Sequence, residues 1–224
     1  MSALLLIGIT PGRCKPGTAP THRRIEGPGW TALAIEVDPD TAAHEETALA
    51  WAAAQNKVLS AYVSAVDVLP VPLGALFSDA TALTVHVMTE WQRWSTALKR
   101  IQGACEFVLR VDVADQRTRA APAPSGTAYL KQRLTARNDR ATLGHRRNTF
   151  LGALSAVADR QAMATRRRDG GLLCMTLLVR RTACDGLIAL LSGRANEARD
   201  LGLSCTLIGP SPAYSFTEVE PACA

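Results

Sequence analysis

The side chains that could bind a metal ion or act as nucleophiles are scattered along the sequence. Its four histidines lie far apart, and none of its six cysteines forms a C-x-x-C pair. A zinc site needs thiolate and imidazole ligands at short, regular spacings. Most of the cysteines lie in apolar segments, where buried and reduced thiols are the usual state. The sequence therefore predicts no metal site and no cofactor.

Phosphate binding has two weak candidates. The loop at residues 12–17 carries Arg13 and Lys15 after a predicted strand, but it does not open a helix, whose N–H groups would bind phosphate. The run Arg166–Arg168 has no interleaved aromatic residues that could stack on bases, and it is better interpreted as the solvated end of a helix. A nucleic-acid partner is therefore a minor alternative, and we predict none.

The sequence contains no arrangement of residues that would support acid–base or nucleophilic catalysis. Glu45 and Glu46 are adjacent on a predicted helix, so their carboxylates diverge and cannot flank one substrate atom. The sequence contains no G-x-G-x-x-G, no G-x-x-x-x-G-K-[ST] and no G-x-S-x-G. We therefore predict no catalytic residues and a protein that is not an enzyme.

The composition is that of a globular protein. The chain has 224 residues, 47% of them hydrophobic, and a formal net charge of +5, which is only a mild basic bias. This length fits one or two domains. Leu4–Ile9 is not preceded by a basic residue, as a signal peptide would require, and Leu172–Val179 is far too short to cross a bilayer. We expect a cytoplasmic protein that does not enter a membrane.

The first half of the sequence predicts three strands and two long helices. Period-two alternation at Glu106–Val113 is the strongest strand signal, and residues 14–29 read as an irregular loop. The prolines of Val68–Phe77 favour an edge strand or a loop. The expected strands are Leu4–Ile9, Trp30–Val37 and Glu106–Val113. The first expected helix spans 42–63, and the second begins after a cap at Ser78 or Asp79 and ends at Ile101.

The second half predicts a linker followed by helices and two strands. Ala114–Ser125 is rich in proline, alanine and arginine, and we interpret it as the linker between domains 1–118 and 119–224. A helix beginning at Ser125 should be interrupted or bent at Asn138–Gly144, and a long helix should follow over 145–165. The remaining elements are strands at Leu172–Val179 and Leu203–Ile208, with a helix over Thr182–Leu201 between them. The fold class is α+β.

Three segments in order resemble a known family. They are LPVPLGALFSD at Leu69–Asp79, GACEFVLRV at Gly103–Val111 with a following S-G-x-x-Y-L that contains Tyr129, and GPSPAYSF at Gly209–Phe216. This order and spacing is similar to that of the gas vesicle protein F and gas vesicle protein L family. The chain departs from the family pattern at Pro72, Leu73, Ser211 and Ala213, and it has Gln55 or Asn56 near a position where the family often has histidine.

The resemblance implies an N-terminal α+β domain and a C-terminal modified ferredoxin-like domain with a helical extension. It implies an accessory or minor structural protein of gas vesicle assembly, whose partners are the hydrophobic shell protein and other gas vesicle accessory proteins, and which is not an enzyme. The motif residues and possible partner contacts that it singles out are Leu69, Pro70, Gly74, Phe77, Gly103, Glu106, Tyr129, Gly209, Pro210, Tyr214 and Phe216.

Two alternatives stay open at the level of sequence. The motif side chains Leu69, Phe77, Tyr214 and Phe216 could serve packing rather than partner contact. The ferredoxin-like domain could bind a small ligand or be an enzyme of unknown substrate, which would require a pocket with convergent polar groups. On the second long helix, Trp91 is predicted to lie in the core, and Trp94 could be either core or a partner-binding residue.

Overall fold

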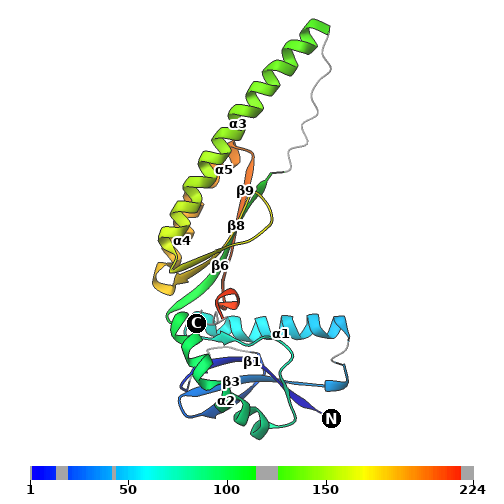
Figure 1. Cartoon of the computed structure of the whole chain (residues 1–224), viewed down its shortest axis with the longest axis vertical. Helices are drawn as coiled ribbons and strands as arrows, with labels where there is room; N and C mark the ends of the chain where they lie inside the picture. Colours follow the sequence, from blue (N-terminus) through cyan, green and yellow to red (C-terminus); the bar gives the residue numbers. More distant parts are fainter. Residues whose placement is uncertain (1, 14–19, 42–43, 115–125, 218–224) are drawn as a thin grey trace, which may run out of the picture. The chain divides into compact units, whose positions relative to one another are not determined.

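The computed structural model describes residues 2–13, 20–41, 44–114 and 126–217, with the backbone alone for 126–140 (Figure 1). The chain divides into two compact units that are discontinuous in sequence. Unit 1 comprises Met1–Phe107, Leu178–Thr182 and Gly209–Ala224, and unit 2 comprises Val108–Leu177 and Ala183–Ile208. The predicted domain boundary after residue 118, and all of the predicted linker except Ala114, lie outside the described residues, so this division stays a prediction.

The chain is an α+β protein, as predicted, and its strands form two sheets. The first sheet has the strand order β2-β3-β1-β4, with β5 also paired to β1, and the second has the order β7-β8-β6-β9. The strands are β1 (Ala3–Pro11), β2 (Arg23–Gly27), β3 (Trp30–Val37), β4 (Leu69–Pro70), β5 (Leu76–Phe77), β6 (Ala104–Val113), β7 (Ala164–Arg167), β8 (Leu173–Arg180) and β9 (Leu203–Ser211). The α-helices are α1 (Glu45–Val63), α2 (Ala80–Arg100), α3 (Gly126–Gln161), α4 (Cys184–Gly193) and α5 (Ala195–Asp200).

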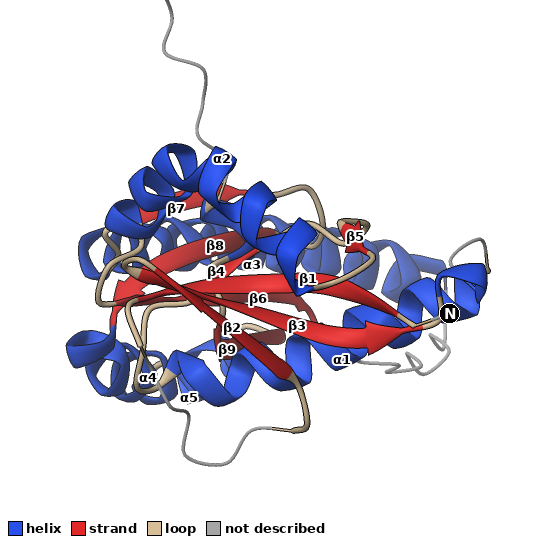
Figure 2. Cartoon of the chain, turned by 90° about the horizontal axis from the view of Figure 1, so that it is seen from below, coloured by secondary structure: helices blue, strands red, loops and turns tan. Residues whose placement is uncertain are grey.

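Unit 1 places α1 and α2 on opposite faces of the first sheet (Figures 1 and 2). On the α2 side, Leu4, Leu6 and Ile9 of β1 share one apolar cluster with the buried stripe of α2. The register of β1 against β3 shifts between Leu6 and Gly8. Side chains alternate along a strand, so Ile9 would face away from Leu6 without this bulge. The bulge therefore keeps all three side chains in the core under α2.

Helix α2 begins after Asp79, as predicted, and ends at Arg100, one residue before the predicted end. The Asp79 carboxylate accepts the backbone N–H of Ala82 at 2.9 Å, and this bond lowers the pKa of Asp79. Gly103 follows the helix with a φ of +69°, a conformation that favours glycine. The predicted apolar stripe is also confirmed: Leu83, Val87, Trp94 and Leu98 are buried, and Trp91 packs against the same cluster.

The elements from β6 onward follow the order β-α-β-β-α-β, which is the ferredoxin-like arrangement. Within unit 2, α3 buries Phe150, Leu154 and Ala158 on one side, and β6 buries Leu109 and Val111. The expected alternation of β6 is confirmed over Phe107, Leu109 and Val111, but Val113 at the end of the strand is exposed.

Three local predictions are wrong. The interruption expected at Asn138–Gly144, as one alternative to a bend, is absent, because a single glycine in a helix costs only about 1 kcal/mol and α3 continues through it. The helix expected to reach residue 165 ends at Gln161, and Ala164–Arg167 forms β7, so Arg166–Arg168 is not a helix end. The helix expected over 182–201 is divided into α4 and α5 at Arg194, whose N–H already bonds the Leu191 carbonyl.

The loop expected at residues 14–29 contains a strand that sequence analysis missed. Strand β2 pairs antiparallel with β3, with Gly27 opposite Trp30. A Cβ atom on Gly27 would lie 2.2 Å from the indole of Trp30, and Gly29 has a φ of +81°. The glycines that read as loop signals are therefore required by a tight hairpin turn.

Candidate functional site

The segment LPVPLGALF forms the edge of the first sheet in unit 1. Strand β4 pairs with β1 at Leu69, β5 pairs with β1 at Phe77, and the N–H of Leu6 donates to the Ala75 carbonyl at 3.0 Å. Gly74 turns the chain between the two short strands with a φ of +119°. The edge strand expected from the prolines is confirmed, and Leu69 is buried.

Gln55 is a buried contact that sequence analysis missed. Its side chain is 5% exposed, and Nε2 donates to the carbonyls of Ile7, at 2.8 Å, and Val71, at 2.7 Å. The amide thereby joins β1 to the segment after β4 and satisfies two buried acceptors. A polar glutamine among the apolar residues of α1 was the feature of the sequence that could have predicted this buried hydrogen-bonding side chain.

A second polar contact fixes the turn between α2 and β6. Asp67 Oδ1 accepts the N–H of Gly103 at 2.8 Å and lies 2.5 Å from Arg181 Nη2. Arg181 Nη1 also donates to the carbonyl of Ala104 at 3.3 Å. Gly103, one of the predicted motif residues, is therefore held by a paired carboxylate in a partly buried position.

The closing segment, which we define as Gly209–Phe216, is held by Glu106. Glu106 is only 4% exposed, and its carboxylate accepts the N–H of Ser215 at 2.7 Å and the Ser215 hydroxyl at 2.9 Å. The Ser211 hydroxyl donates to the Glu106 carbonyl at 3.1 Å. Charge-assisted bonds of this kind are stronger than neutral ones, so the buried carboxylate anchors the segment to unit 1.

Backbone packing at Gly209 holds the same segment. Gly209 has a φ of +140°, and a Cβ atom there would lie 2.6 Å from Phe107 Cδ1 and 2.8 Å from the Glu106 carbonyl oxygen. No other residue fits this conformation and this space. The peptide bond from Gly209 to Pro210 is cis.

The aromatic residues of the closing segment lie in two environments. Phe216 is 3% exposed and belongs to the apolar cluster of α2, together with Ala213. Tyr214 is 37% exposed, and its hydroxyl donates to Asn56 Oδ1 at 3.5 Å. Partial burial, with a smaller contribution from the Glu106 charge, raises the pKa of Tyr214 to about 12. Phe216 is therefore placed for packing, whereas Tyr214 stays accessible.

The last motif residue is outside this region. Tyr129 lies in α3, in the part where only the backbone is described. Ten of the eleven predicted residues thus belong to unit 1, and Tyr129 belongs to unit 2.

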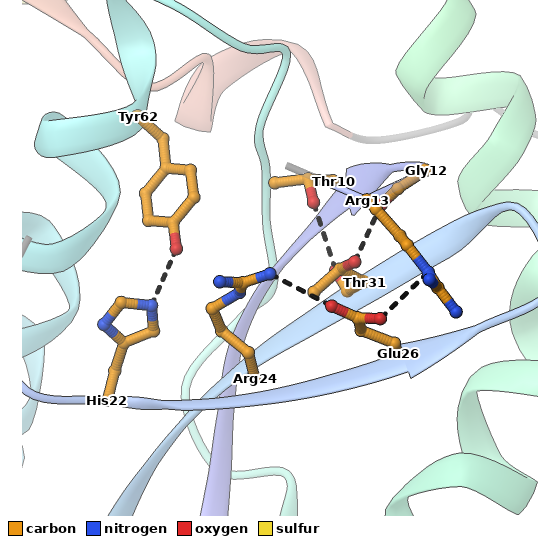
Figure 3. A network of polar contacts seen from close by, with 8 residues as sticks. All are labelled: Thr10, Gly12, Arg13, His22, Arg24, Glu26, Thr31 and Tyr62. Carbon is orange, nitrogen blue, oxygen red and sulfur yellow. Dashed lines mark hydrogen bonds and ion pairs between the residues drawn. The ribbon is translucent and has the colours of Figure 1, made fainter. Parts of the chain in front are cut away.

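A network of polar contacts lies at the C-terminal end of β1 (Figure 3). The Thr31 hydroxyl donates to the Gly12 carbonyl at 2.7 Å, and the Gly12 N–H donates to the Gly29 carbonyl at 2.9 Å. Glu26 pairs with Arg13 at 3.0 Å and with Arg24 at 3.1 Å. The glycine-rich loop considered for phosphate thus begins with a backbone N–H that is already bonded and an arginine that is already paired.

His22 belongs to the same region. Its Nδ1 lies 2.6 Å from the Pro20 carbonyl, which can only accept, so Nδ1 carries the proton and Nε2 accepts from the Tyr62 hydroxyl at 2.7 Å in the neutral ring (Figure 3). Within the described residues, no group of three His, Cys, Asp or Glu side chains could hold a metal ion. None of the described helices has the length and apolar character needed to span a membrane.

Comparison with known proteins identifies the family. No curated relative matches the chain. Two solved structures are similar: the gas vesicle protein GvpF from Anabaena sp. PCC7120 (TM-score 0.71, 13% identity, 99% of this chain and 100% of that chain) and GvpF from Microcystis aeruginosa (TM-score 0.70, 11% identity, 97% and 99%). At these identities the likeness shows the fold. The sequence match over residues 21–218 then shows that the chain belongs to the family of gas vesicle synthesis proteins GvpL/GvpF.

Proposed function

We propose that this chain is a non-catalytic accessory or minor structural protein of gas vesicles that binds the hydrophobic shell protein, other gas vesicle accessory proteins, or both. The family match over residues 21–218 carries this proposal. The proposed location is the cytoplasm and the gas vesicle. The fold shared with two GvpF proteins is consistent with the same role.

Exposed apolar side chains on α2 support a protein-binding role. Val85 and Met88 are 60% and 59% exposed and lie three residues apart, so they project from the same side of the helix. An apolar shell subunit must be covered before it assembles, and a partner with exposed apolar groups can provide part of that cover. Methionine suits such a surface because its side chain adapts to different partners.

The test is a pull-down from cells that make gas vesicles, with the tagged full chain as bait. We expect the shell protein or other gas vesicle proteins to be enriched over a bait of similar size and charge. Purified chain mixed with purified accessory proteins should reproduce the strongest of these contacts. Recovery of none of these proteins by either route would overturn the proposal.

The predicted contacts in the closing segment can be tested in the same experiment. Tyr214→Ala removes an accessible aromatic side chain, whereas Phe216→Ala removes a buried one. If Tyr214 contacts a partner, Tyr214→Ala should weaken capture with little loss of thermal stability. Parallel losses of stability and capture in both variants would assign the two residues to packing alone.

A further inference from the structure

Unit 1 contains a groove along the second half of α2 that none of the family motifs includes. Its volume is about 280 Å³. We call it the α2 groove. Trp91, Leu98 and Lys99 of α2 form one side, and Pro11 and Gly29 form the other. A volume at the lower limit of ligand pockets suits one or two amino-acid side chains rather than a large cofactor.

The side of the groove opposite α2 is fixed before any ligand binds. Pro11 ends β1, and Gly29 lies in the turn between β2 and β3. The Gly12 N–H bonds the Gly29 carbonyl. The Thr31 hydroxyl bonds the Gly12 carbonyl (Figure 3), and the two bonds hold these chain segments together. A site that is already ordered loses less conformational entropy on binding. The groove therefore has the rigidity of a binding site rather than that of a surface loop.

Three side-chain donors of the groove have no partner among the described residues, whereas the Ser95 hydroxyl already donates to the Gln92 carbonyl at 2.9 Å. Among the described residues, the Lys99 ammonium, the Gln102 side-chain amide and the Trp91 indole N–H make no hydrogen bond or ion pair. The carboxylate that also lines the groove, Asp67, is neutralised by Arg181 and already accepts the Gly103 N–H. The groove thus presents one uncompensated positive charge and two neutral donors next to apolar walls.

We propose that the α2 groove binds an acidic side chain, together with a neighbouring apolar side chain, from an internal segment of a partner protein. Lys99 would pair with the carboxylate, and Trp91 and Leu98 would contact the apolar side chain. A chain terminus is a poorer fit, because capture of a terminal carboxylate uses free backbone N–H groups. Of the groove residues, Pro11 has no N–H, and the Gln102 N–H already bonds the Lys99 carbonyl. This inference rests on the proposed function, which supplies protein partners.

The direct test is a peptide array probed with the purified full chain. The probes are overlapping peptides with blocked ends, which tile the shell protein and the gas vesicle accessory proteins of the same cell. We expect the retained peptides to share an Asp or Glu beside an apolar residue, and to lose retention when that acid becomes Asn or Gln. Binding should weaken as salt is raised, because the contact is partly exposed.

Lys99→Glu should weaken binding of the retained peptides by about tenfold or more, since it replaces attraction by repulsion. Lys57→Glu is the matched control: Lys57 is exposed on α1 in unit 1 and does not line the groove. Trp91→Phe, which keeps an aromatic ring in the core contact, should weaken binding while the chain stays folded. Equal binding by the wild type, Lys99→Glu and Trp91→Phe would overturn the inference.

A pull-down with the same variants separates failure of this inference from failure of the proposed function. If the wild type and Lys99→Glu capture gas vesicle proteins equally, the function stands and the groove is not the binding site. If the wild type captures none, the proposed function itself fails, and the groove loses its partner with it. Selective loss of capture by Lys99→Glu supports both.

Discussion

The closing segment and the α2 groove are both in unit 1, yet their polar groups are used in opposite ways. In the closing segment, the buried Glu106 carboxylate is met by the N–H and hydroxyl of Ser215, and Phe216 is buried. In the groove, the side chains of Lys99 and Gln102 make no hydrogen bond or ion pair within the described residues. An unpaired polar group in the core lowers the free energy of unfolding, whereas an unpaired donor in a surface groove is hydrated and stays available to a ligand. Motif residues with satisfied bonds therefore indicate stability, and unsatisfied donors outside the motifs indicate recognition.

The largest effect should come from Gly209→Val. The added side chain would collide with Phe107 and with the Glu106 carbonyl, at a backbone φ that β-branched residues avoid. We expect a loss of more than about 3 kcal/mol in the free energy of unfolding, measured by urea denaturation. Gly152→Ala in α3 is the control, since an added Cβ meets nothing there and should stabilise the helix by up to about 1 kcal/mol. A Gly209→Val protein as stable as the wild type would show that the closing segment is not packed as described.

Glu106→Ala should be next in size. It removes the carboxylate that accepts two partly buried hydrogen bonds from Ser215, at a cost of about 2 to 4 kcal/mol. Glu106→Gln keeps one acceptor oxygen and should cost less. Glu36→Ala is the matched control, because its ion pair with Arg23 at 3.3 Å is exposed and worth less than about 1 kcal/mol. Equal stability of the Glu106 and Glu36 variants would remove the distinction between buried and exposed carboxylates on which the comparison rests.

These two residues also show how far the sequence could predict the site. The motif pattern selected Glu106 and Gly209, but their contact with each other depends on β6 and the closing segment meeting, which no local pattern encodes. The α2 groove has no sequence signature at all. It arises because the hairpin turn at Gly29 lies against the end of α2. That turn follows strand β2, which the nearby glycines led us to predict as a loop.

Elements with strong periodicity were predicted well. The strand at Glu106–Val113 and the stripe of α2 follow from alternation and helical spacing, which act locally. The errors occur where tertiary context decides. Gly144 is tolerated inside α3, and Arg166 and Arg167 join a strand because β8 is available to pair with them. The buried Gln55 is a similar case, since its two acceptors come from distant segments.

Lys99→Gln should change stability very little and binding substantially. Lys99 is exposed and unpaired among the described residues, so its loss should alter the free energy of unfolding by less than about 0.5 kcal/mol. The same change removes the only uncompensated charge among the described groove residues, so peptide binding should weaken. Denaturation and peptide binding measured on one preparation would check this. A stability loss as large as that of Glu106→Ala would show that Lys99 stabilises the fold, and would contradict its role in binding.

The smallest effect is a pH dependence that comes from Tyr214. Its pKa is raised to about 12 in the folded chain, against about 10 in an unfolded chain, so the folded state holds the phenolic proton more tightly. The stabilisation is fully present below about pH 10 and is lost as the pH rises toward 12. Because the side chain is 37% exposed, solvent screening makes this loss smaller than the shift alone would give. Denaturation of the wild type and Tyr214→Phe at pH 9 and pH 11 should show a steeper decline for the wild type. Parallel declines would mean that the Tyr214 hydroxyl is as well solvated in the folded chain as in the unfolded one, which would contradict its partial burial.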